Sequence, residues 1–597
     1  MSRAVPRFRP LRALLALLTG AALLAPAALV GAGPAVAAES GVTPLEFTVR
    51  AGGRSCTVDA DLYRPAGVDA EHPAPAVLAT NGFGGSKSDG TTDALGRAFA
   101  SRGYVSLVYS GLGFGGSGCL ITLDDPADDG KAASALIDFL AGTRAADDGT
   151  EADYVVSDGP GDPRVGMVGG SYGGAVQLAT ASTDHRVDAL VPLVTWNDLA
   201  HALAPNAAGA RHGVSSDTPG VFKWQWTNGF YLIGEGQPLL VPSLDPSRFN
   251  RLTCLHFATR ACDMIRLLNS GRLPAGSTRE MLAYARGVSP VSYLAGVRAP
   301  TLLVQGQADS LFNLDEATAT YRTLQAQGTA AKMIWQAWGH SGGFVPGELD
   351  LAAGNLDTSY VGQRILAWFD RYLRLDESAD TGPAFAYHRD WASGYGTAAA
   401  LPDASRTLYL SGDGALVDDR SQVAPGSRRY TNGPLPTSHS ESSLARLIGL
   451  SDPAPYDTKG TYLGWTSAPL TAPVDVVGAP KATLRVGSPA TERVQDSGDA
   501  ADRLVLFAKV YDVASDGTQK LVNRLVAPVR VPDVTRPFTV RLPGIVHRFG
   551  TGHRLRFVIA GSDTAYFGNR GVRPVTVTST PEDTGLLELP VVGGSAP

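Results

Sequence analysis

A short glycine-rich turn between an apolar run and a small-residue segment most constrains what this chain can fold into. The run 165–168 leads into Gly169-Gly170-Ser171-Tyr172-Gly173-Gly174, and the residues of 175–181 that follow are typical of a helix. A strand that turns sharply into a tightly packed helix needs glycines there, and the turn lifts the serine hydroxyl clear of the sheet. The helix start behind it favours developing negative charge. This context predicts a nucleophilic serine, Ser171, on a parallel sheet.

The pattern Gly-x-Ser-x-Gly occurs a second time in the sequence, at Gly339-His340-Ser341-Gly342-Gly343. The chain has 69 glycines, so chance matches are expected and the flanking sequence has to decide between them. The Phe-Val-Pro-Gly of 344–347 follows the second match, and it cannot start a helix. We therefore assign the nucleophile to Ser171 and interpret Ser341 as the residue that follows a catalytic base.

A base and an acid for this serine follow two later apolar runs. A serine hydroxyl reacts only when a base takes its proton, and the base needs an orienting acid. On sheets with such a turn, the acid and then the histidine follow the serine in loops after later strands. The runs 301–305 and 332–336 are followed by Asp309 and His340, whereas the rival Asp315 lies at a helix start. The predicted triad is Ser171, Asp309 and His340.

Two backbone amides are expected to hold the oxyanion of such a reaction. One is the amide of Tyr172, directly after the serine, and the other comes from the loop after an early strand. That loop is the Asn-Gly-Phe-Gly-Gly-Ser of 81–86, which follows the apolar run 76–79 and points to the amide of Phe83. A second glycine-rich stretch, 110–118, lacks the Gly-Lys-Ser/Thr of a phosphate-binding loop.

The pattern of apolar and polar residues divides the chain into regions. Strand-like and helical segments alternate over 40–375, which predicts an α/β domain with a parallel sheet. The aromatic and polar stretch 197–292 interrupts this alternation and is predicted to be a helical cap. A polar segment with a Gly-Pro, 376–390, is expected to be a linker. Short strand-like runs separated by turn signals, 521–526 among them, then predict an all-β sandwich of jelly-roll type over 391–597.

The first 37 residues are predicted to be a cleaved secretory signal peptide. Four arginines precede an apolar run at 13–25, and Ala35-Val36-Ala37 offers a small-residue cleavage site. The protein is therefore expected to be secreted, with no integral membrane span after removal of the signal. The net charge of −6 with no basic cluster argues against nucleic acid as a partner. The oligomeric state is left open.

Four cysteines in an exported chain suggest disulfides. The close pair Cys254–Cys262 and the remaining pair Cys56–Cys119 are the pairing we favour among the three that four cysteines allow. No Cys-x-x-Cys or histidine-rich cluster suggests a metal site. The predicted chemistry needs no cofactor.

The assembled motifs resemble those of the X-prolyl dipeptidyl peptidase and cocaine esterase family of serine hydrolases. The residues that carry the resemblance are the loop at 81–85, the Asp-Pro-Arg-Val-Gly at 162–166, the turn at Ser171, the Trp-Thr-Ser-Ala-Pro-Leu at 465–470 and the Tyr-Asp-Val at 511–513. The resemblance implies an α/β-hydrolase fold with a helical cap and a C-terminal jelly-roll domain. It also implies cleavage of Xaa-Pro dipeptides from N-termini, or of acyl esters. Members often have a tyrosine at the position of Phe83, whose hydroxyl helps to hold the oxyanion. Here either a backbone N–H takes the place of that hydroxyl or the oxyanion site is weaker.

The substrate is expected to be a small ester or peptide, and several residues of the cap segment are candidates to hold it. The aromatic candidates either line an apolar acyl or proline pocket or pack the cap against the sheet, and Asp198 is the candidate partner of a substrate amine. The candidates are Trp196, Asp198, Phe222, Trp224 and Trp226. Alternatives are a lipase-like or polyester-cleaving esterase and a non-catalytic envelope or carbohydrate-binding protein that uses the β-domain.

Overall fold

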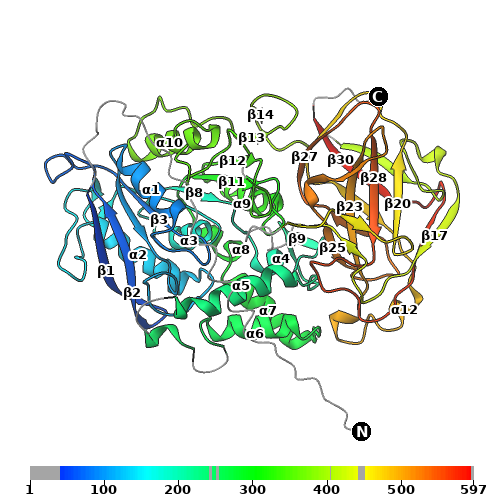
Figure 1. Cartoon of the computed structure of the whole chain (residues 1–597), viewed down its shortest axis with the longest axis horizontal. Coiled ribbons are helices and arrows are strands. Elements are labelled where there is room, and N and C mark those ends of the chain that lie inside the picture. The colour runs from blue at the N-terminus through cyan, green and yellow to red at the C-terminus, as the bar shows by residue number, and fades with distance from the viewer. Residues whose placement is uncertain are drawn as a thin grey trace, which may run out of the picture. The chain divides into compact units, whose positions relative to one another are not determined.

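The computed structural model describes residues 41–240, 245–250, 254–343, 345–403, 405–441 and 451–592. The predicted signal peptide, 1–37, lies outside the described residues. Within them, a ten-stranded sheet is followed by a β-rich region (Figure 1). The chain thus has the α/β part and the following β part that its pattern of apolar and polar residues predicts.

The ten-stranded sheet has the order β1-β2-β4-β3-β7-β8-β11-β12-β13-β14. Its strands from β4 to β13 pair in parallel, and the remaining pairs are antiparallel. The central strands are buried on both faces, as continuous apolar runs require. The ten strands of the sheet are β1 Val42–Ala51, β2 Arg54–Tyr63, β3 Ala76–Thr80, β4 Val105–Tyr109, β7 Val165–Gly170, β8 Val187–Leu193, β11 Thr301–Gly306, β12 Ala331–Gln336, β13 Phe385–His388 and β14 Tyr395–Ala398.

Helices cover both faces of this sheet. One face packs against α1 (Gly90–Ala100) and α10 (Tyr360–Leu373), and the other against α2 (Lys131–Leu140), α3 (Tyr172–Ala181) and α9 (Leu314–Ala326) (Figure 1). The apolar stripe of α10 recurs at helical spacing and is buried in the core. The sheet is therefore a rigid support for loops at its carboxyl edge.

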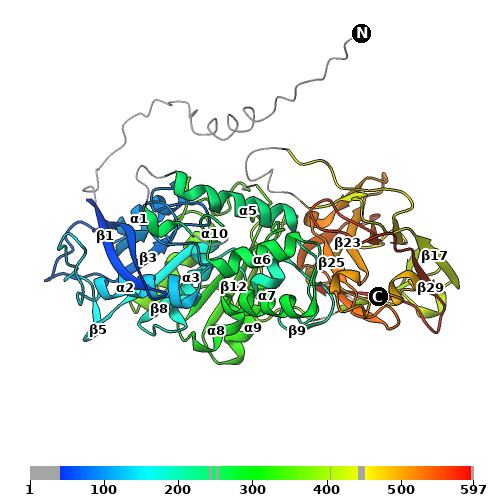
Figure 2. The same cartoon turned by 90° about the horizontal axis from the view of Figure 1, so that it is seen from below.

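The segment between β8 and β11 forms the predicted helical cap. Its helices are α4 (Leu199–Leu203), α5 (Trp224–Gly236), α6 (Thr259–Asn269), α7 (Ala275–Gly287) and α8 (Pro290–Tyr293), and it also contains a short hairpin of β9 (Ala210–His212) and β10 (Ser215–Ser216). Helices α5, α6 and α7 pack beside one another (Figure 2). A disulfide joins Cys254 to Cys262 in the cap, with 6.1 Å between the Cα atoms. A second disulfide joins Cys56 to Cys119, at 5.5 Å.

The predicted linker, 376–390, differs from the structure. Strand β13 lies inside it and pairs in parallel with β12, and β14 extends the same sheet. Phe385 and Ala386 are almost fully buried in the core of the α/β part. The boundary at 390 is therefore wrong, because a four-residue strand leaves too short a pattern to separate it from its polar neighbours.

The β-rich region builds a twelve-stranded sheet around a core of its own. Two further pairs, β17 (Gly426–Tyr430) with β29 (Val575–Ser579) and β18 (Ser438–His439) with β19 (Tyr456–Asp457), lie beside it. The expected strand at 521–526 is wrong, since a 3₁₀ turn at Val522–Arg524 separates two strands. The strands of the large sheet are β15 Ser405–Leu410, β16 Ala415–Val417, β20 Tyr462–Ser467, β21 Val474–Gly478, β22 Lys481–Leu484, β23 Val505–Val513, β24 Gln519–Leu521, β25 Ala527–Arg530, β26 Phe538–Arg541, β27 Ile545–Phe549, β28 Arg554–Ala560 and β30 Leu586–Val592.

Candidate active site

Ser171 lies at the junction of β7 and α3, in the strained conformation that its turn demands. Its φ of 56° and ψ of −117° are unusual for a residue with a side chain, and such a conformation costs of order 1–3 kcal/mol. The neighbouring glycines explain how the turn closes. A Cβ on Gly169 would lie 2.7 Å from the Gly173 oxygen, and one on Gly173 would lie 2.5 Å from the Thr80 oxygen. Strand, turn and helix can pack this closely only without those side chains.

The structure brings Ser171, His340 and Asp309 together from three separate loops. The His340 Nε2 lies 3.0 Å from the Ser171 Oγ, and the His340 Nδ1 lies 2.7 Å from the Asp309 Oδ2. The same carboxylate oxygen accepts the backbone amide of His340 at 3.2 Å. The imidazole therefore has one nitrogen at the serine and the other at the carboxylate, which is the arrangement that general-base activation of a serine needs.

The Asp309 carboxylate is fully buried and held by backbone amides. Its Oδ1 accepts from the amides of Leu311 at 2.9 Å and Phe312 at 2.8 Å, while Oδ2 faces His340. Hydrogen bonds to a carboxylate favour its charged form and fix its direction. The loop after β11 thus presents an oriented carboxylate to the imidazole.

The second Gly-x-Ser-x-Gly match has a structural explanation. Ser341 is buried, and its Oγ accepts the amide of Ser310 at 2.9 Å and hydrogen-bonds the Ser310 hydroxyl. A Cβ on Gly339 would lie 2.6 Å from the Asp309 Cβ, and one on Gly342 would lie 2.6 Å from the Ala308 Cβ. These glycines let the two loops meet, and Ser341 ties the histidine loop to the acid loop.

The two predicted oxyanion donors lie beside Ser171. Tyr172 follows it at the start of α3, and the loop with Phe83 is close, because a Cβ on Gly82 would be 3.9 Å from the Ser171 Cβ. The Tyr172 hydroxyl accepts the amide of Asp124 at 3.1 Å, and burial raises the pKa of this phenol well above its ordinary value. The hydroxyl is therefore engaged and neutral.

A small apolar pocket opens onto Ser171. The ring of Phe83 forms part of its wall and packs against the rings of Tyr172 at 5.7 Å and Phe230 at 5.3 Å. None of its lining residues is charged. They are Phe83, Leu123, Ser171, Tyr172, Trp196, Leu199, Leu203, Thr227, Phe230, Tyr231, Phe257, Met264, Ile265, Leu311 and Phe312.

Two of the five predicted pocket residues lie at this site. Trp196 lines the pocket, 5.1 Å from the Phe312 ring. Trp226 is fully buried behind it, edge-on to His340 at 6.4 Å, and its Nε1 donates to the Ser310 Oγ at 3.3 Å. Trp226 therefore supports the acid and histidine loops.

The other three predicted pocket residues, Asp198, Phe222 and Trp224, do not line the pocket. The fully buried Asp198 carboxylate caps α4 through the Ala200 amide and pairs with Arg286 at 3.3 Å, so it is not available to a substrate amine. Phe222 packs on Phe567 of the β-rich region, and the Trp224 Nε1 donates to the Thr564 oxygen at 3.0 Å. These aromatics join the cap to the β-rich region.

Several residues of the pocket wall have no signal in the sequence. Phe230 and Tyr231 lie on α5, and Met264 and Ile265 on α6, among other apolar residues of the cap helices. Leu311 and Phe312 follow Asp309 closely in the chain, so the position of the predicted acid is the signal that could have found them. Apolar periodicity alone does not distinguish a pocket wall from a core.

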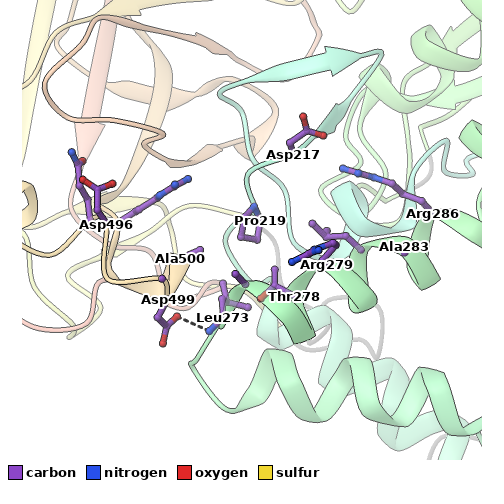
Figure 3. A pocket seen from close by; sticks show the side chains of 15 residues that line it. Asp217, Pro219, Leu273, Thr278, Arg279, Ala283, Arg286, Asp496, Asp499 and Ala500 are labelled. Atoms are coloured by element: carbon purple, nitrogen blue, oxygen red, sulfur yellow. Dashed lines mark hydrogen bonds between the residues drawn. The ribbon is translucent and has the colours of Figure 1, made fainter.

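Another cavity, between α7 and the loop 495–503, is distinct from this site (Figure 3). Its lining includes charged side chains of both signs and none of the triad residues; the charged ones are Asp217, Arg279, Arg286, Asp496, Asp499 and Arg503. Within the described residues, no group of three or more His, Cys, Asp or Glu side chains could hold a metal ion. None of the described helices is long and apolar enough to cross a membrane.

Comparisons with known proteins identify relatives by sequence. One family profile, the X-Pro dipeptidyl-peptidase (S15 family), matches residues 53–342, and a second, the X-Pro dipeptidyl-peptidase C-terminal non-catalytic domain, matches 379–584. Two curated proteins named as serine esterases, from Mycobacterium bovis and Mycobacterium tuberculosis, are each 24% identical over 338 residues, 51% of this chain and 52% of theirs. The chain thus spans about half the length of these relatives.

Solved structures show the same fold over nearly the whole chain. An aminopeptidase from a marine sediment Thaumarchaeota archaeon has a TM-score of 0.63 at 15% identity, covering 95% of this chain and 99% of that one. An α-amino acid ester hydrolase has a TM-score of 0.63 at 16% identity, covering 94% and 98%. A CocE/NonD family hydrolase from Staphylococcus aureus has a TM-score of 0.58 at 13% identity, covering 93% and 97%.

These likenesses confirm the predicted α/β-hydrolase fold with a following β-rich domain. They do not favour a non-catalytic envelope or carbohydrate-binding protein. With both profiles matched in order along the chain, the protein belongs to the X-Pro dipeptidyl-peptidase (S15) family of serine hydrolases.

Proposed function

We propose that this protein is a secreted esterase that hydrolyses esters of apolar acyl groups through an acyl-enzyme on Ser171. The observation that carries the proposal is the Ser171–His340–Asp309 relay at the floor of a pocket without a charged wall. An uncharged, aromatic-rich pocket suits an apolar acyl group. Secretion rests on the predicted signal peptide.

The first half of the reaction forms the acyl-enzyme. The His340 Nε2 takes the proton of the Ser171 hydroxyl as the oxygen attacks the ester carbonyl. Asp309 holds the imidazole in the required direction and stabilises its positive charge. The amides of Phe83 and Tyr172 stabilise the oxyanion, and the phenyl ring of Phe83 supplies no hydroxyl. The imidazolium then protonates the leaving alkoxide as the carbon–oxygen bond breaks.

The second half releases the acid. Water enters, His340 takes one of its protons, and the resulting hydroxide attacks the acyl carbonyl. The tetrahedral intermediate collapses with return of the proton from His340 to Ser171. Because acid and base alternate on a single imidazole, no cofactor takes part in these steps.

Replacing the nucleophile tests the assignment. Ser171→Ala should lower kcat for a p-nitrophenyl ester by at least about 10³-fold and abolish labelling by a fluorophosphonate. Ser341→Ala is the matched control, because it changes the serine of the second motif and should still be labelled. A Ser171→Ala protein that keeps both turnover and labelling would contradict the proposal.

The substrate class requires a separate comparison between esters and dipeptidyl anilides. The family description points to Xaa-Pro peptides, whose N-terminal ammonium would need a polar partner on binding. No carboxylate lines the described pocket, and Asp198 is paired elsewhere. We therefore expect kcat/KM for short acyl esters to exceed that for Ala-Pro and Gly-Pro anilides by about 100-fold or more. Equal or reversed values would support the dipeptidyl-peptidase alternative.

A further inference from the structure

A buried lysine from the cap contacts the loop that carries Asp309. Lys223 precedes α5 and is only 4% exposed. Its Nζ donates to the backbone oxygens of Ser310 at 2.5 Å and Leu311 at 3.2 Å. A buried ammonium is retained only where its charge and its donors are satisfied. The acid loop is thus one of the partners that hold this lysine inside the protein.

The peptide groups that Lys223 contacts adjoin those that hold the acid. The amides of Leu311 and Phe312 donate to the Asp309 Oδ1, and the Ser310 and Leu311 carbonyls belong to the peptide units that carry these two amides. A cation at a carbonyl oxygen polarises the peptide and strengthens donation by its N–H. Lys223 therefore acts on the Asp309 carboxylate indirectly, because two peptide groups accept from the lysine at their carbonyls and donate to the carboxylate at their amides.

Residues of the β-rich region lie near the Lys223 ammonium as well. The Lys223 Nζ lies 5.9 Å from the centre of the Tyr566 ring, and the Tyr566 hydroxyl donates to the Glu441 Oε2 at 2.8 Å. Glu441 is buried, and burial raises its pKa to about 8, although Lys223 acts in the opposite direction. Residues about 220 positions apart in the sequence thus share one buried environment.

The charged and titratable groups around Lys223 come from every element packed against it. Burial lowers the pKa of Lys223, and nearby carboxylates oppose this shift. Of these, the Glu316 carboxylate also contacts the His201 Nδ1 at 2.7 Å. The carboxylates whose charges act on Lys223 are Asp309 in the acid loop, Glu316 in α9 and Glu441 in the β-rich region, and the Tyr566 ring faces its ammonium. Behind them lie the titratable partners of these carboxylates: His340 at Asp309, His201 at Glu316, and Asp563 near Glu441.

We propose that Lys223 is a positioning residue for the Asp309–His340 pair. The lysine holds the acid loop in place, and its positive charge lowers the tendency of the His340 imidazole to take up a proton. The proposal rests on the proposed function, since it takes Asp309 as the acid of the triad. It also gives the β-rich region a part in the site, because Glu441 and Tyr566 enclose the lysine. The effect is indirect, as Lys223 does not line the substrate pocket.

The test measures the pH profile of kcat/KM for a p-nitrophenyl ester. Lys223→Met removes a positive charge beside the pair, so the imidazole should protonate more readily and the acid limb should move to higher pH by about half a unit to one unit. We expect kcat to fall about tenfold or more with little change in KM, because the loop is less well held. Lys223→Arg, which keeps charge and donors, should restore most of kcat and the original acid limb.

Further variants separate charge from folding. Lys223→Gln keeps a donor but not the charge, and should show the same shift of the acid limb even if Lys223→Met does not fold. Lys332→Met is the matched control, since that ammonium also holds a loop, through Thr381 and Gly382, at the opposite end of β12 from His340. It should leave the acid limb in place.

The outcomes distinguish this proposal from the one it rests on. If Ser171→Ala is inactive and the folded Lys223→Gln variant keeps the wild-type acid limb, the positioning role is overturned while the proposed function stands. A shift of equal size in Lys332→Met would also overturn it, because the effect would then be unspecific. If Ser171→Ala retains turnover, both proposals fall.

Discussion

Single glycines set the separation of the triad residues. The contact of Gly339 with the Asp309 side chain leaves no room for a methyl group, since its Cβ would also be 2.9 Å from the Asp309 Oδ2. The neighbouring His340 is placed by the same backbone. The geometry of the acid and the base therefore depends on a residue that takes no part in the chemistry.

Gly339→Ala should reduce kcat by about 100-fold while the protein stays folded. A Cβ there must push the histidine loop from the acid, and a displacement of about 1 Å at a catalytic group can cost this much. The measurement is ester hydrolysis together with a thermal melt. Gly276→Ala in α7, where no atom lies within 4 Å of the added Cβ, is the matched control and should keep wild-type kcat. Unchanged activity in Gly339→Ala would contradict this view.

Among the elements, the turn before α2 carries an unusual buried acid. Asp129 lies in the π-helical turn Pro126–Gly130, which packs against α3, and its Oδ2 accepts the hydroxyl of Thr122. Burial raises the pKa of Asp129 from 3.8 to about 7. The folded state therefore binds a proton that the unfolded chain releases at lower pH, so this residue makes stability fall as pH rises from about 4 to about 7.

Asp129→Asn should remove that part of the pH dependence. The amide keeps the size of the side chain and cannot ionise, so the variant should melt at a higher temperature than the wild type above pH 7. The difference in Tm should shrink towards pH 4, where the wild-type carboxyl is protonated. Thermal melts at pH 4, 5.5 and 8 measure it. A Tm difference that does not change with pH would contradict the expected protonation.

At the level of the whole molecule, Arg530 joins the cap to the β-rich region. It lies on β25, is 5% exposed, and donates to the backbone oxygens of Pro219 and Gly220. Nearby, the Asn206 side chain bonds both the amide and the carbonyl oxygen of Arg530. This part of the cap is thus hydrogen-bonded to the β-rich region.

Arg530→Met should uncouple the two regions. It removes charge-assisted hydrogen bonds and leaves buried carbonyls without a donor, a loss of about 3 kcal/mol. We expect calorimetry to show two separate transitions, the first of them below the melting temperature of the wild type. The matched control is Arg548→Met. It removes an ion pair with Asp475 that lies at the surface of the protein, where such pairs contribute little to stability. A single transition at the wild-type temperature would show that the contact does not couple the regions.

Much of the architecture was predictable because its signals are local. The buried strands β3, β4, β7, β11 and β12 and the helix α10 appear in the sequence as apolar runs or stripes of the right period. Strand β13 did not, since four residues carry too little pattern. The mis-predicted strand at 521–526 failed because its apolar composition gives no sign that Asn523 and Arg524 adopt positive φ values.

The sequence by itself determined the turn at Ser171 and the order in which Asp309 and His340 follow it, because glycines and chain order are properties of local sequence. Only the tertiary structure decided which aromatic residues line the pocket. Trp196 and Trp224 were both candidates for the pocket wall, yet one lines the pocket and the other contacts the β-rich region. It also decided that Lys223 is buried beside the acid loop. Such placements depend on packing between distant segments, and composition carries no record of which partner an apolar or charged side chain will meet.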